Sequence, residues 1–263
     1  MEVEVSVLSS GSSGNSIYIN DGENSFLIDA GLSGKKLINR LKKIDVTPQD
    51  LDGIFITHEH KDHTKGVGIL SRRLDIPIYA NGETWAVCES ELGKLKDKNI
   101  QSFSGDFSFG NFDIKPIAIS HDARAPVAYV VYRDNKKMVF ATDMGYINEE
   151  LMNELKDIDL LLLESNHDID MLMSGSYPRF LKRRIRGEKG HLSNDAAAKI
   201  LPKLINGKCP QVLLGHLSEE NNNPKVAYMT VENILKAKGL EVDKDLKLDL
   251  TYQHKPTRIY KIK

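Results

Sequence analysis

Three imidazoles and the carboxylate of Asp62 lie within six consecutive residues of this chain, in the segment His58-Glu59-His60-Lys61-Asp62-His63. The segment directly follows the apolar run Ile54-Phe55-Ile56, which predicts a strand that ends just before the first histidine. Imidazole and carboxylate groups are ligands that suit zinc, manganese or iron. A single histidine is more often an ordinary polar residue than a ligand. Three histidines and Asp62 at this spacing instead predict a metal site.

Other candidate ligands follow other apolar runs. They are His121 after residues 117–119, Asp143 after residues 138–141, Glu164 and His167 after residues 160–163, and His216 after residues 212–214. If these runs are strands of one sheet with aligned carboxyl ends, their polar side chains converge on one edge, where ligands usually bind in such sheets. The repetition of the pattern is what makes a shared site the preferred interpretation.

The elements that must position these side chains alternate along the chain. Strands are expected at 3–8, 16–19, 54–56, 77–80, 114–119, 127–132, 138–141, 160–163 and 212–214, and helices at 32–44, 67–74, 83–94, 148–156, 194–204 and 224–238. Interleaved strands and helices predict an α/β protein. The runs 160–163 and 212–214 are apolar on both faces, as in strands buried between layers. Because no low-complexity linker interrupts the pattern, we expect one domain over residues 1–263.

Composition excludes several classes of protein. The chain has 263 residues, of which 40% are apolar, so it can bury a substantial core. No apolar run approaches the length that spans a bilayer, and the N-terminal alternation of acids and valines predicts a strand, not a signal peptide. Cys88 and Cys209 lack the spacing of a disulfide framework, which favours a cytoplasmic location.

The net charge is only −1, so binding to a polyanion would require a local basic patch. Residues 179–189 carry six basic side chains and one acid, and they lead directly to His191. Such a run could be a solvated helix face or a track for phosphates, which Lys and Arg neutralise without reading sequence. Tyr177 or Phe180 could stack on a base or pack internally. The loop 9–14, rich in Ser and Gly, could likewise approach a phosphate or simply join two strands.

The motif H-x-H-x-D-H, followed by His121, Asp143 and His216, resembles the metallo-β-lactamase fold in its binuclear hydrolase form. The resemblance implies an αβ/βα four-layer sandwich, with His58, His60 and His121 on one divalent ion and with Asp62, His63 and His216 on another. Asp143 would bridge the two ions, which would be Zn²⁺ or Mn²⁺, with Fe²⁺ not excluded. Two such ions can lower the pKa of a bound water towards about 7.

Details within the superfamily narrow the expected activity. Antibiotic-hydrolysing members carry Cys where this chain has Asp143, and flavo-diiron proteins carry Glu where it has His60. The segments around Glu164 and His191 resemble those of the tRNase Z group, in which a Glu–His pair delivers a proton to the leaving oxygen. Leu163 stands where that group has His, so His167 could share the role, and Glu164 could instead be a structural hydrogen-bond acceptor.

Five segments together closely resemble the WalJ (YycJ, VicX) family: Ser-Ser-Gly-Ser-Ser-Gly-Asn-Ser, His-Glu-His-Lys-Asp-His, Glu-Ser-Asn-His-Asp, Gly-His-Leu-Ser-Asn and Leu-Gly-His-Leu-Ser-Glu-Glu-Asn-Asn. The resemblance implies a metal-dependent 5′→3′ exonuclease that acts on DNA, associated with DNA repair. The candidate catalytic residues are Asp62, Glu164, His167 and His191. The candidate substrate-binding residues are Arg183, Arg184, Arg186, Ser193 and Asn194.

Only 73 positions separate Asp143 from His216, which leaves no room for the large cap domain of some related nucleases. We therefore expect a compact enzyme that accepts a strand end and contacts the phosphate backbone of DNA. Two alternatives remain open at this stage. One is an RNA-processing or small-phosphodiester hydrolase with the same site, and the other is a non-catalytic module with a structural metal.

Overall fold

The computed structural model describes residues 2–205 and 207–263. The chain divides into two compact units. The first consists of Met1–Pro116, Ala123–Val127 and Tyr252–Lys263, and the second of Ile117–Asp122 and Ala128–Thr251. Among the described residues, no helix has the length and apolar character needed to cross a bilayer.

The first unit contains a seven-stranded sheet in the order β14-β1-β2-β3-β4-β5-β6. Its strands are β1 (Val3–Ser9), β2 (Ser16–Asn20), β3 (Ser25–Ile28), β4 (Gly53–Phe55), β5 (Ile78–Asn81), β6 (Ile100–Phe103) and β14 (Tyr260–Ile262). Neighbours from β14 to β3 are antiparallel, and neighbours from β3 to β6 are parallel. The carboxyl ends of β3 and β4 therefore lie side by side, which places the loops after them at one edge.

The helices of this unit are α1 (Gly34–Lys42), α2 (Lys61–Thr64), α3 (Val67–Leu74) and α4 (Gly82–Leu92). Leu37 and Leu41 of α1 and Val67 and Leu70 of α3 are fully buried in one hydrophobic cluster with the sheet residue Ile54. The hairpin β7 (Phe107–Phe109) and β8 (Phe112–Ala118) supplies a second, aromatic cluster. Its rings meet those of Phe26 and Phe55 at centroid distances of 5.2–5.5 Å.

In the second unit the strands follow the order β13-β12-β11-β10-β9. They are β9 (Val127–Arg133), β10 (Lys136–Ala141), β11 (Leu160–Glu164), β12 (Gln211–Gly215) and β13 (Lys247–Leu250). Strands β10 to β13 are parallel, and β9 is antiparallel to β10. The predicted alignment of the carboxyl ends of residues 138–141, 160–163 and 212–214 is therefore confirmed.

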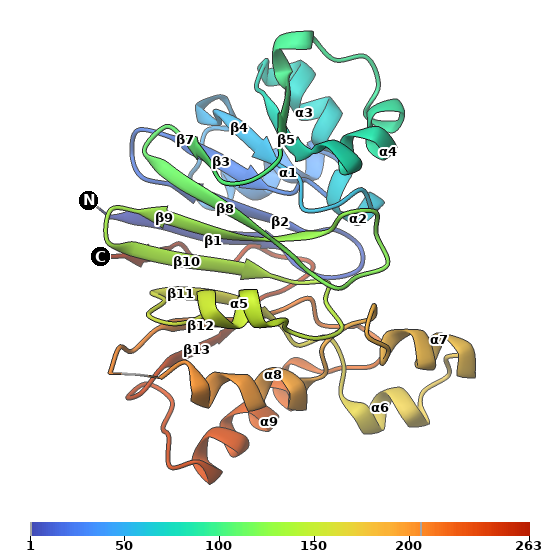
Figure 1. Cartoon of the computed structure of the whole chain (residues 1–263), viewed down its shortest axis with the longest axis vertical. Coiled ribbons are helices and arrows are strands. Elements are labelled where there is room, and N and C mark those ends of the chain that lie inside the picture. Colours follow the sequence, from blue (N-terminus) through green and yellow to red (C-terminus); the bar gives the residue numbers. More distant parts are fainter. Residues whose placement is uncertain (1, 206) are drawn as a thin grey trace. The chain divides into compact units, whose positions relative to one another are not determined.

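Helices α5 (Glu149–Glu154), α6 (Ile169–Ser174), α7 (Arg179–Ile185), α8 (Asn194–Ile200) and α9 (Pro224–Ala237) complete this unit. Figure 1 shows α8 and α9 together on one face of the sheet, and α6 and α7 as a separate helical projection. Ala197, Ala198 and Ala227 are fully buried against the apolar strands β11 and β12, because small side chains let the helices approach the sheet closely.

The expected helices and strands are all present, with ends that differ by a few residues. The expected helix 194–204 is shorter, because α8 ends at Ile200 and a 3-10 turn from Leu201 to Lys203 follows it. Asn223 caps α9 and Pro224 occupies its first turn, where proline is favoured. Both cysteines are free thiols.

Candidate metal-binding and catalytic site

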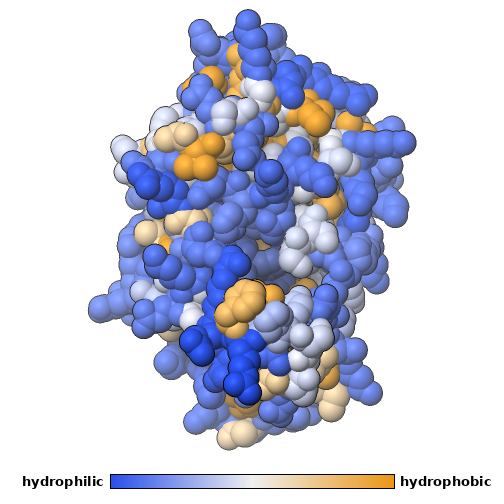
Figure 2. Space-filling model, turned by 90° about the vertical axis from the view of Figure 1, so that its right-hand side faces the viewer, coloured by the Kyte–Doolittle hydropathy of each residue, from blue (hydrophilic) through white to orange (hydrophobic). Residues whose placement is uncertain are grey.

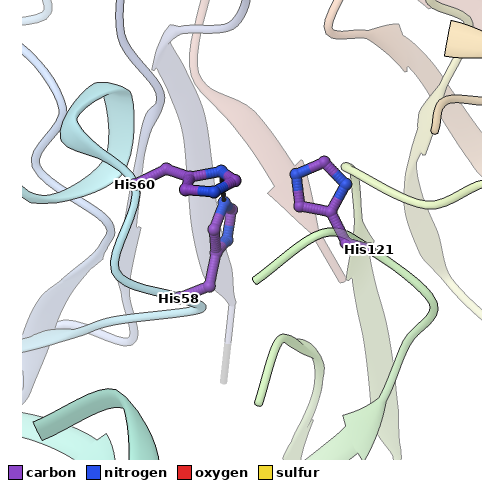
Figure 3. Close-up of side chains that lie close together, drawn as sticks. All are labelled: His58, His60 and His121. Atoms are coloured by element: carbon purple, nitrogen blue, oxygen red, sulfur yellow. Dashed lines mark hydrogen bonds between the residues drawn. The ribbon is translucent and has the colours of Figure 1, made fainter. Parts of the chain in front are cut away.

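The histidine motif lies where β4 passes into α2, and His60 is the residue that precedes this short helix. His58 and His63 are fully buried. The ring of His58 contacts that of His60, with 3.1 Å between Nε2 of His58 and Nδ1 of His60 (Figure 3). The centroids of His58 and His63 are 4.0 Å apart. Three imidazoles are thereby gathered at one strand end, and imidazole in its neutral form is a common metal ligand.

A buried carboxylate lies behind His63. Nδ1 of His63 lies 2.7 Å from Oδ2 of Asp29, which also accepts a hydrogen bond from the Thr57 hydroxyl at 2.8 Å. Burial raises the pKa of Asp29, while the contacts with His63 and Thr57 oppose that shift. Histidine ligands of metals usually donate their other ring N–H to such a carboxylate, which leaves Nε2 as the donor to the metal.

The backbone around this motif is tightly packed. The amide of Asn15 donates to the carbonyl of Asp62 at 2.7 Å, and that of Ala30 donates to the carbonyl of His63 at 2.8 Å. A Cβ atom on Gly31 would lie 1.6 Å from the Asp62 carbonyl oxygen, so only glycine fits here. The side-chain amide of Asn15 also lies 3.0 Å from Nε2 of His63 and 3.3 Å from Asp62.

The second unit brings together another set of candidate ligands. Asp143, Glu164, His191 and His216 each offer a donor atom within 4.8 Å of the others. The register explains three of these positions, because Ala141 pairs with Leu163 and Glu164 pairs with Gly215. Nδ1 of His216 lies 3.2 Å from Oδ1 of Asp143. Nε2 of His121 lies 4.0 Å from the same oxygen, and burial lowers the pKa of His121.

Glu164 is fully buried at the centre of this set. Its Oε1 lies 2.7 Å from Nδ1 of His191 and 2.9 Å from Nδ1 of His216. Its Oε2 accepts hydrogen bonds from the amides of Met144 at 2.9 Å and Leu192 at 3.2 Å. Although burial opposes ionisation, the two histidines hold the pKa of Glu164 at about 2. Burial lowers the pKa of His191, but the charge of Glu164 outweighs it and raises that pKa.

Three of the polar residues that follow strands have left-handed backbones. The φ angles are 60° at Asp29 after β3, 61° at Asp143 after β10 and 55° at His216 after β12. Outside glycine this conformation is uncommon and costs about 1–3 kcal/mol unless the surroundings hold it. Asp143 and His216 are two of the eight non-glycine residues with this conformation in the described part of the chain, and both belong to the candidate site.

The basic segment is held against the loops that carry His121 and Asp143. Nε of Arg184 donates to Oδ2 of Asp122 at 2.8 Å, next to His121. The hydroxyl of Ser120 donates to the carbonyl of Glu188 at 2.8 Å. A Cβ atom on Gly145 would lie 2.1 Å from that same carbonyl oxygen, so the two backbones are in close contact.

Some sequence-predicted residues have other surroundings than expected. Asn194 is fully buried, and its side chain bonds to Ser165 at 2.6 Å and to Asn222. A contact between Asn194 and a substrate stays a prediction. Ser193 caps α8 by accepting a hydrogen bond from the Ala196 amide at 3.1 Å. Arg184 is already paired with Asp122.

His167 is buried, and burial lowers its pKa to about 4. Within the described residues, its Nδ1 has no hydrogen-bond partner, and the observed support for His191 comes from Glu164. In the loop 9–14, the amide of Ser13 donates to Gln253 at 2.8 Å, and the amide of Gly11 donates to Asn15 at 2.9 Å. Internal acceptors therefore occupy these amides, which favours the plain strand connection over a phosphate cradle.

Sequence reasoning missed Asp29 and Asn15. Asp29 stands directly after the apolar run Phe26-Leu27-Ile28, so the same strand-end signal that found Asp143 could have found it. Asn15 carried no comparable signal, because its role depends on how the loop 9–14 folds. The donor sets of both units fit divalent metal ions, since imidazoles and carboxylates are suitable ligands. Asp29 supports the ring of His63 and Glu164 supports that of His216, as carboxylates commonly do for metal-binding histidines.

Comparisons with known proteins agree with this fold. Residues 24–216 match the family described as the Beta-lactamase superfamily domain. The crystal structure of the metallo-β-lactamase fold protein YhfI from Bacillus subtilis superposes with a TM-score of 0.73 and 17% identity, over 99% of this chain and 100% of that one. The predicted metallo-β-lactamase fold, with its two sheets and flanking helices, is confirmed.

Two curated relatives are more similar in sequence. Exodeoxyribonuclease WalJ of Streptococcus pneumoniae is 42% identical over 247 residues, which cover 92% of each chain. Exodeoxyribonuclease YycJ of Bacillus anthracis is 38% identical over 261 residues, which cover 98% of this chain and 99% of the relative. The chain belongs to the WalJ/YycJ family of the β-lactamase superfamily.

Proposed function

We propose that this protein is a metal-dependent exodeoxyribonuclease that hydrolyses phosphodiester bonds from the 5′ end of a DNA strand. The observation that carries the proposal is the contact of the buried Glu164 with both His191 and His216. It couples a candidate proton donor to a candidate metal ligand through one carboxylate. The names of the two curated relatives support DNA as the substrate.

The proposed metal ligands follow the family pattern. They are His58, His60 and His121 for one ion, Asp62, His63 and His216 for the other, and Asp143 for both. When bound, such a pair of divalent ions supplies an activated water and neutralises charge on the phosphoryl oxygens. Zn²⁺ and Mn²⁺ are the proposed metals, since the donors are nitrogen and oxygen atoms.

The protein's own groups handle the protons. Because Nδ1 of His191 faces Glu164, the proton that reaches the leaving sugar oxygen would come from Nε2 of His191. The raised pKa of His191 keeps that proton available near neutral pH. Asp62 is proposed to orient the attacking water. Its side chain is 26% exposed, so it can reach solvent while its backbone is fixed by Asn15.

The basic segment is proposed to bind the phosphate backbone of DNA. Arg183 and Arg186 are exposed, and Arg184 fixes the helix to Asp122 and contributes its charge from there. Guanidinium groups bind phosphates without reading the base sequence, so any DNA strand would be accepted. A cytoplasmic role in DNA repair is the cellular context that we propose for such an enzyme.

A degradation time course tests this function. Single-stranded DNA labelled at either its 5′ or its 3′ end is incubated with the protein and Mn²⁺, beside RNA of matched sequence. We expect the 5′ label to be released as a mononucleotide at the earliest times, with the 3′-labelled strand shortening progressively. Equal or faster digestion of RNA would favour the RNA-processing alternative. If the metal-loaded protein releases neither label from the DNA, the result would contradict a nuclease function.

A further inference from the structure

The first unit contains a cavity of about 620 Å³, the α3 groove, which is lined by residues of α2, of α3 and of the end of α4. Its volume falls within the range of about 300–1,000 Å³ that is usual for ligand sites. None of the proposed metal ligands lines it, so the function proposed above does not account for it. Figure 2, which faces the side on which α2 and α4 lie in Figure 1, shows a mostly hydrophilic surface there, with hydrophobic groups scattered singly.

The α3 groove is basic. Its charged residues are Lys61, Lys65, Arg72 and Glu91, so three cations and one carboxylate give it a net charge of +2. Nζ of Lys61 lies 4.0 Å from Oε2 of Glu91, but the two side chains are 83% and 52% exposed, and ion pairs this exposed contribute little. Lys61 is therefore free to exchange Glu91 for another anion. The groove is a positive site on a chain whose net charge is −1.

The guanidinium of Arg72 is held in place within this groove. Its Nη1 donates to the carbonyl of Leu92, at the end of α4. A Cβ atom on Gly68 would lie 3.1 Å from this nitrogen, and one on Gly93 would lie 3.2 Å from it, so glycines leave room for the guanidinium on two sides. A guanidinium has five N–H groups, and the bond to Leu92 leaves others for a ligand. A cation fixed before its ligand arrives loses little conformational entropy on binding.

The groove begins at the histidine motif and extends along α3. Lys61 stands between the candidate ligands His60 and Asp62, and Lys65 follows one helical turn later on the same side. Arg72 comes seven positions after Lys65, which is about 10 Å along a helical path. One DNA strand carries a phosphate about every 3.4 Å of its axis, so this length spans about three phosphates. The cations are thus spread out as the charges of a strand are.

We infer that the α3 groove binds the phosphate backbone of the substrate DNA next to the bond that is cleaved. This inference rests on the proposed nuclease function and adds to it a second contact surface, on the unit that does not carry the basic segment 179–189. Free phosphate shares the chemistry, but three separated cations match successive phosphates better than a single anion. Ile69, which is 49% exposed, adds apolar surface that a deoxyribose can contact. Phosphate contacts position a strand without reading its bases, so the groove should set KM and not the rate of the chemical step.

The test uses the full-length, metal-loaded protein and a DNA duplex. A version with phosphorothioate linkages that slow cleavage gives Kd at several salt concentrations, and the cleavable version gives KM and kcat. Inorganic phosphate is titrated separately by calorimetry. The variants are Lys65→Ala, Lys65→Glu and Arg72→Ala. The matched controls are Arg73→Ala and Arg73→Glu, at an exposed arginine of α3 that does not line the groove. Lys65 is exposed, so its variants keep the test valid if Arg72→Ala, which loses the bond to Leu92, does not fold.

Each lost contact with duplex DNA should reduce the magnitude of the slope of log K against log salt by about 0.9, which at 0.1 M salt is a rise in Kd of about 8-fold. We expect this of Lys65→Ala and Arg72→Ala, a larger effect of Lys65→Glu, and wild-type behaviour of Arg73→Ala. KM should rise in the groove variants with kcat little changed.

Effects of the Arg73 variants equal to those of the Lys65 variants would reduce the result to general charge and overturn the inference. Wild-type affinity and salt slope in both Lys65 variants would overturn it as well. If inorganic phosphate binds the wild type but not Lys65→Glu, while DNA affinity is unchanged, the groove holds a free phosphate and the strand contact is refuted.

The same measurements separate this inference from the proposed function. If the wild type binds DNA through Lys65 and Arg72 but never shortens it, the groove contact stands and the exonuclease proposal fails. If the wild type shortens DNA and Lys65→Glu does so with equal KM, the exonuclease stands and the groove contact fails.

Discussion

Oε1 of Glu164 lies 2.7 Å from Nδ1 of His191. This carboxylate is fully buried, and the same oxygen also contacts Nδ1 of His216. The contact fixes the imidazole tautomer, because the carboxylate accepts a hydrogen bond only from a protonated Nδ1. It also raises the pKa of His191. One glutamate thereby sets both the orientation and the protonation of a candidate general acid.

Replacing His191 by Ala should lower kcat by about 10²–10⁴-fold, because a general acid contributes about that much to a proton transfer. The bound metal should remain, since His191 is not among the proposed ligands. Steady-state kinetics on DNA and elemental analysis of the same preparation check this. Loss of metal together with activity would instead assign His191 to the metal site.

Replacing Glu164 by Gln should shift the pH dependence of kcat. Glu164 raises the pKa of His191, so the protonated donor persists to higher pH in the wild type. Without that charge the pKa of His191 falls, and the loss of kcat on the alkaline side should begin at lower pH. A pH–rate profile of both proteins measures this shift. Coincident alkaline limbs, with metal content unchanged, would show that Glu164 is only structural.

Replacing Arg183 and Arg186 by Ala should weaken binding to every DNA sequence alike. For single strands each phosphate contact contributes a slope of about −0.7 in log K against log salt. The loss of two contacts in the double variant should therefore reduce the magnitude of the slope by about 1.4. Binding titrations at several salt concentrations give this slope. Lys225→Ala, an exposed charge on α9, is the control. A slope equal to that of the control would identify the arginines as a solvated face.

Replacing Gly31 by Ala should destabilise the protein by about 1–3 kcal/mol, the usual range for adding atoms to a well-packed site. The added Cβ would lie 1.6 Å from the Asp62 carbonyl oxygen, so the Asp62-His63 backbone would have to move. Denaturant unfolding of the metal-free protein measures the change. Gly105→Ala meets nothing within 4 Å and should be close to neutral. Equal effects of the two substitutions would contradict the close packing.

The sequence predicts the site well where the signal is local to a strand end. Asp143 and His216 each stand one residue beyond an apolar run, and the parallel register of β10, β11 and β12 then brings them together. The apolar character of these runs also predicts a sheet buried between layers, which the burial of β11 and β12 confirms. Strand ends are readable because side-chain type and backbone period agree there.

What the sequence could not predict depends on contacts between distant segments. Nothing near Arg184 indicates that Asp122 will bind it, 62 positions away. Asn194 looks like a substrate ligand in its motif, yet the fold buries it against Ser165 and Asn222. The outward direction of Phe180 likewise follows from which side of α7 packs on the unit, which the charge run alone does not determine.

Metal stoichiometry of the wild type and of Asp143→Ala tests the proposed binuclear centre most directly. The proteins are purified with excess Mn²⁺ or Zn²⁺, desalted and analysed for metal content beside their activity on 5′-labelled DNA. We predict two ions per wild-type chain, and the loss of at least one ion together with cleavage in Asp143→Ala. Two retained ions and undiminished cleavage in Asp143→Ala would contradict the account.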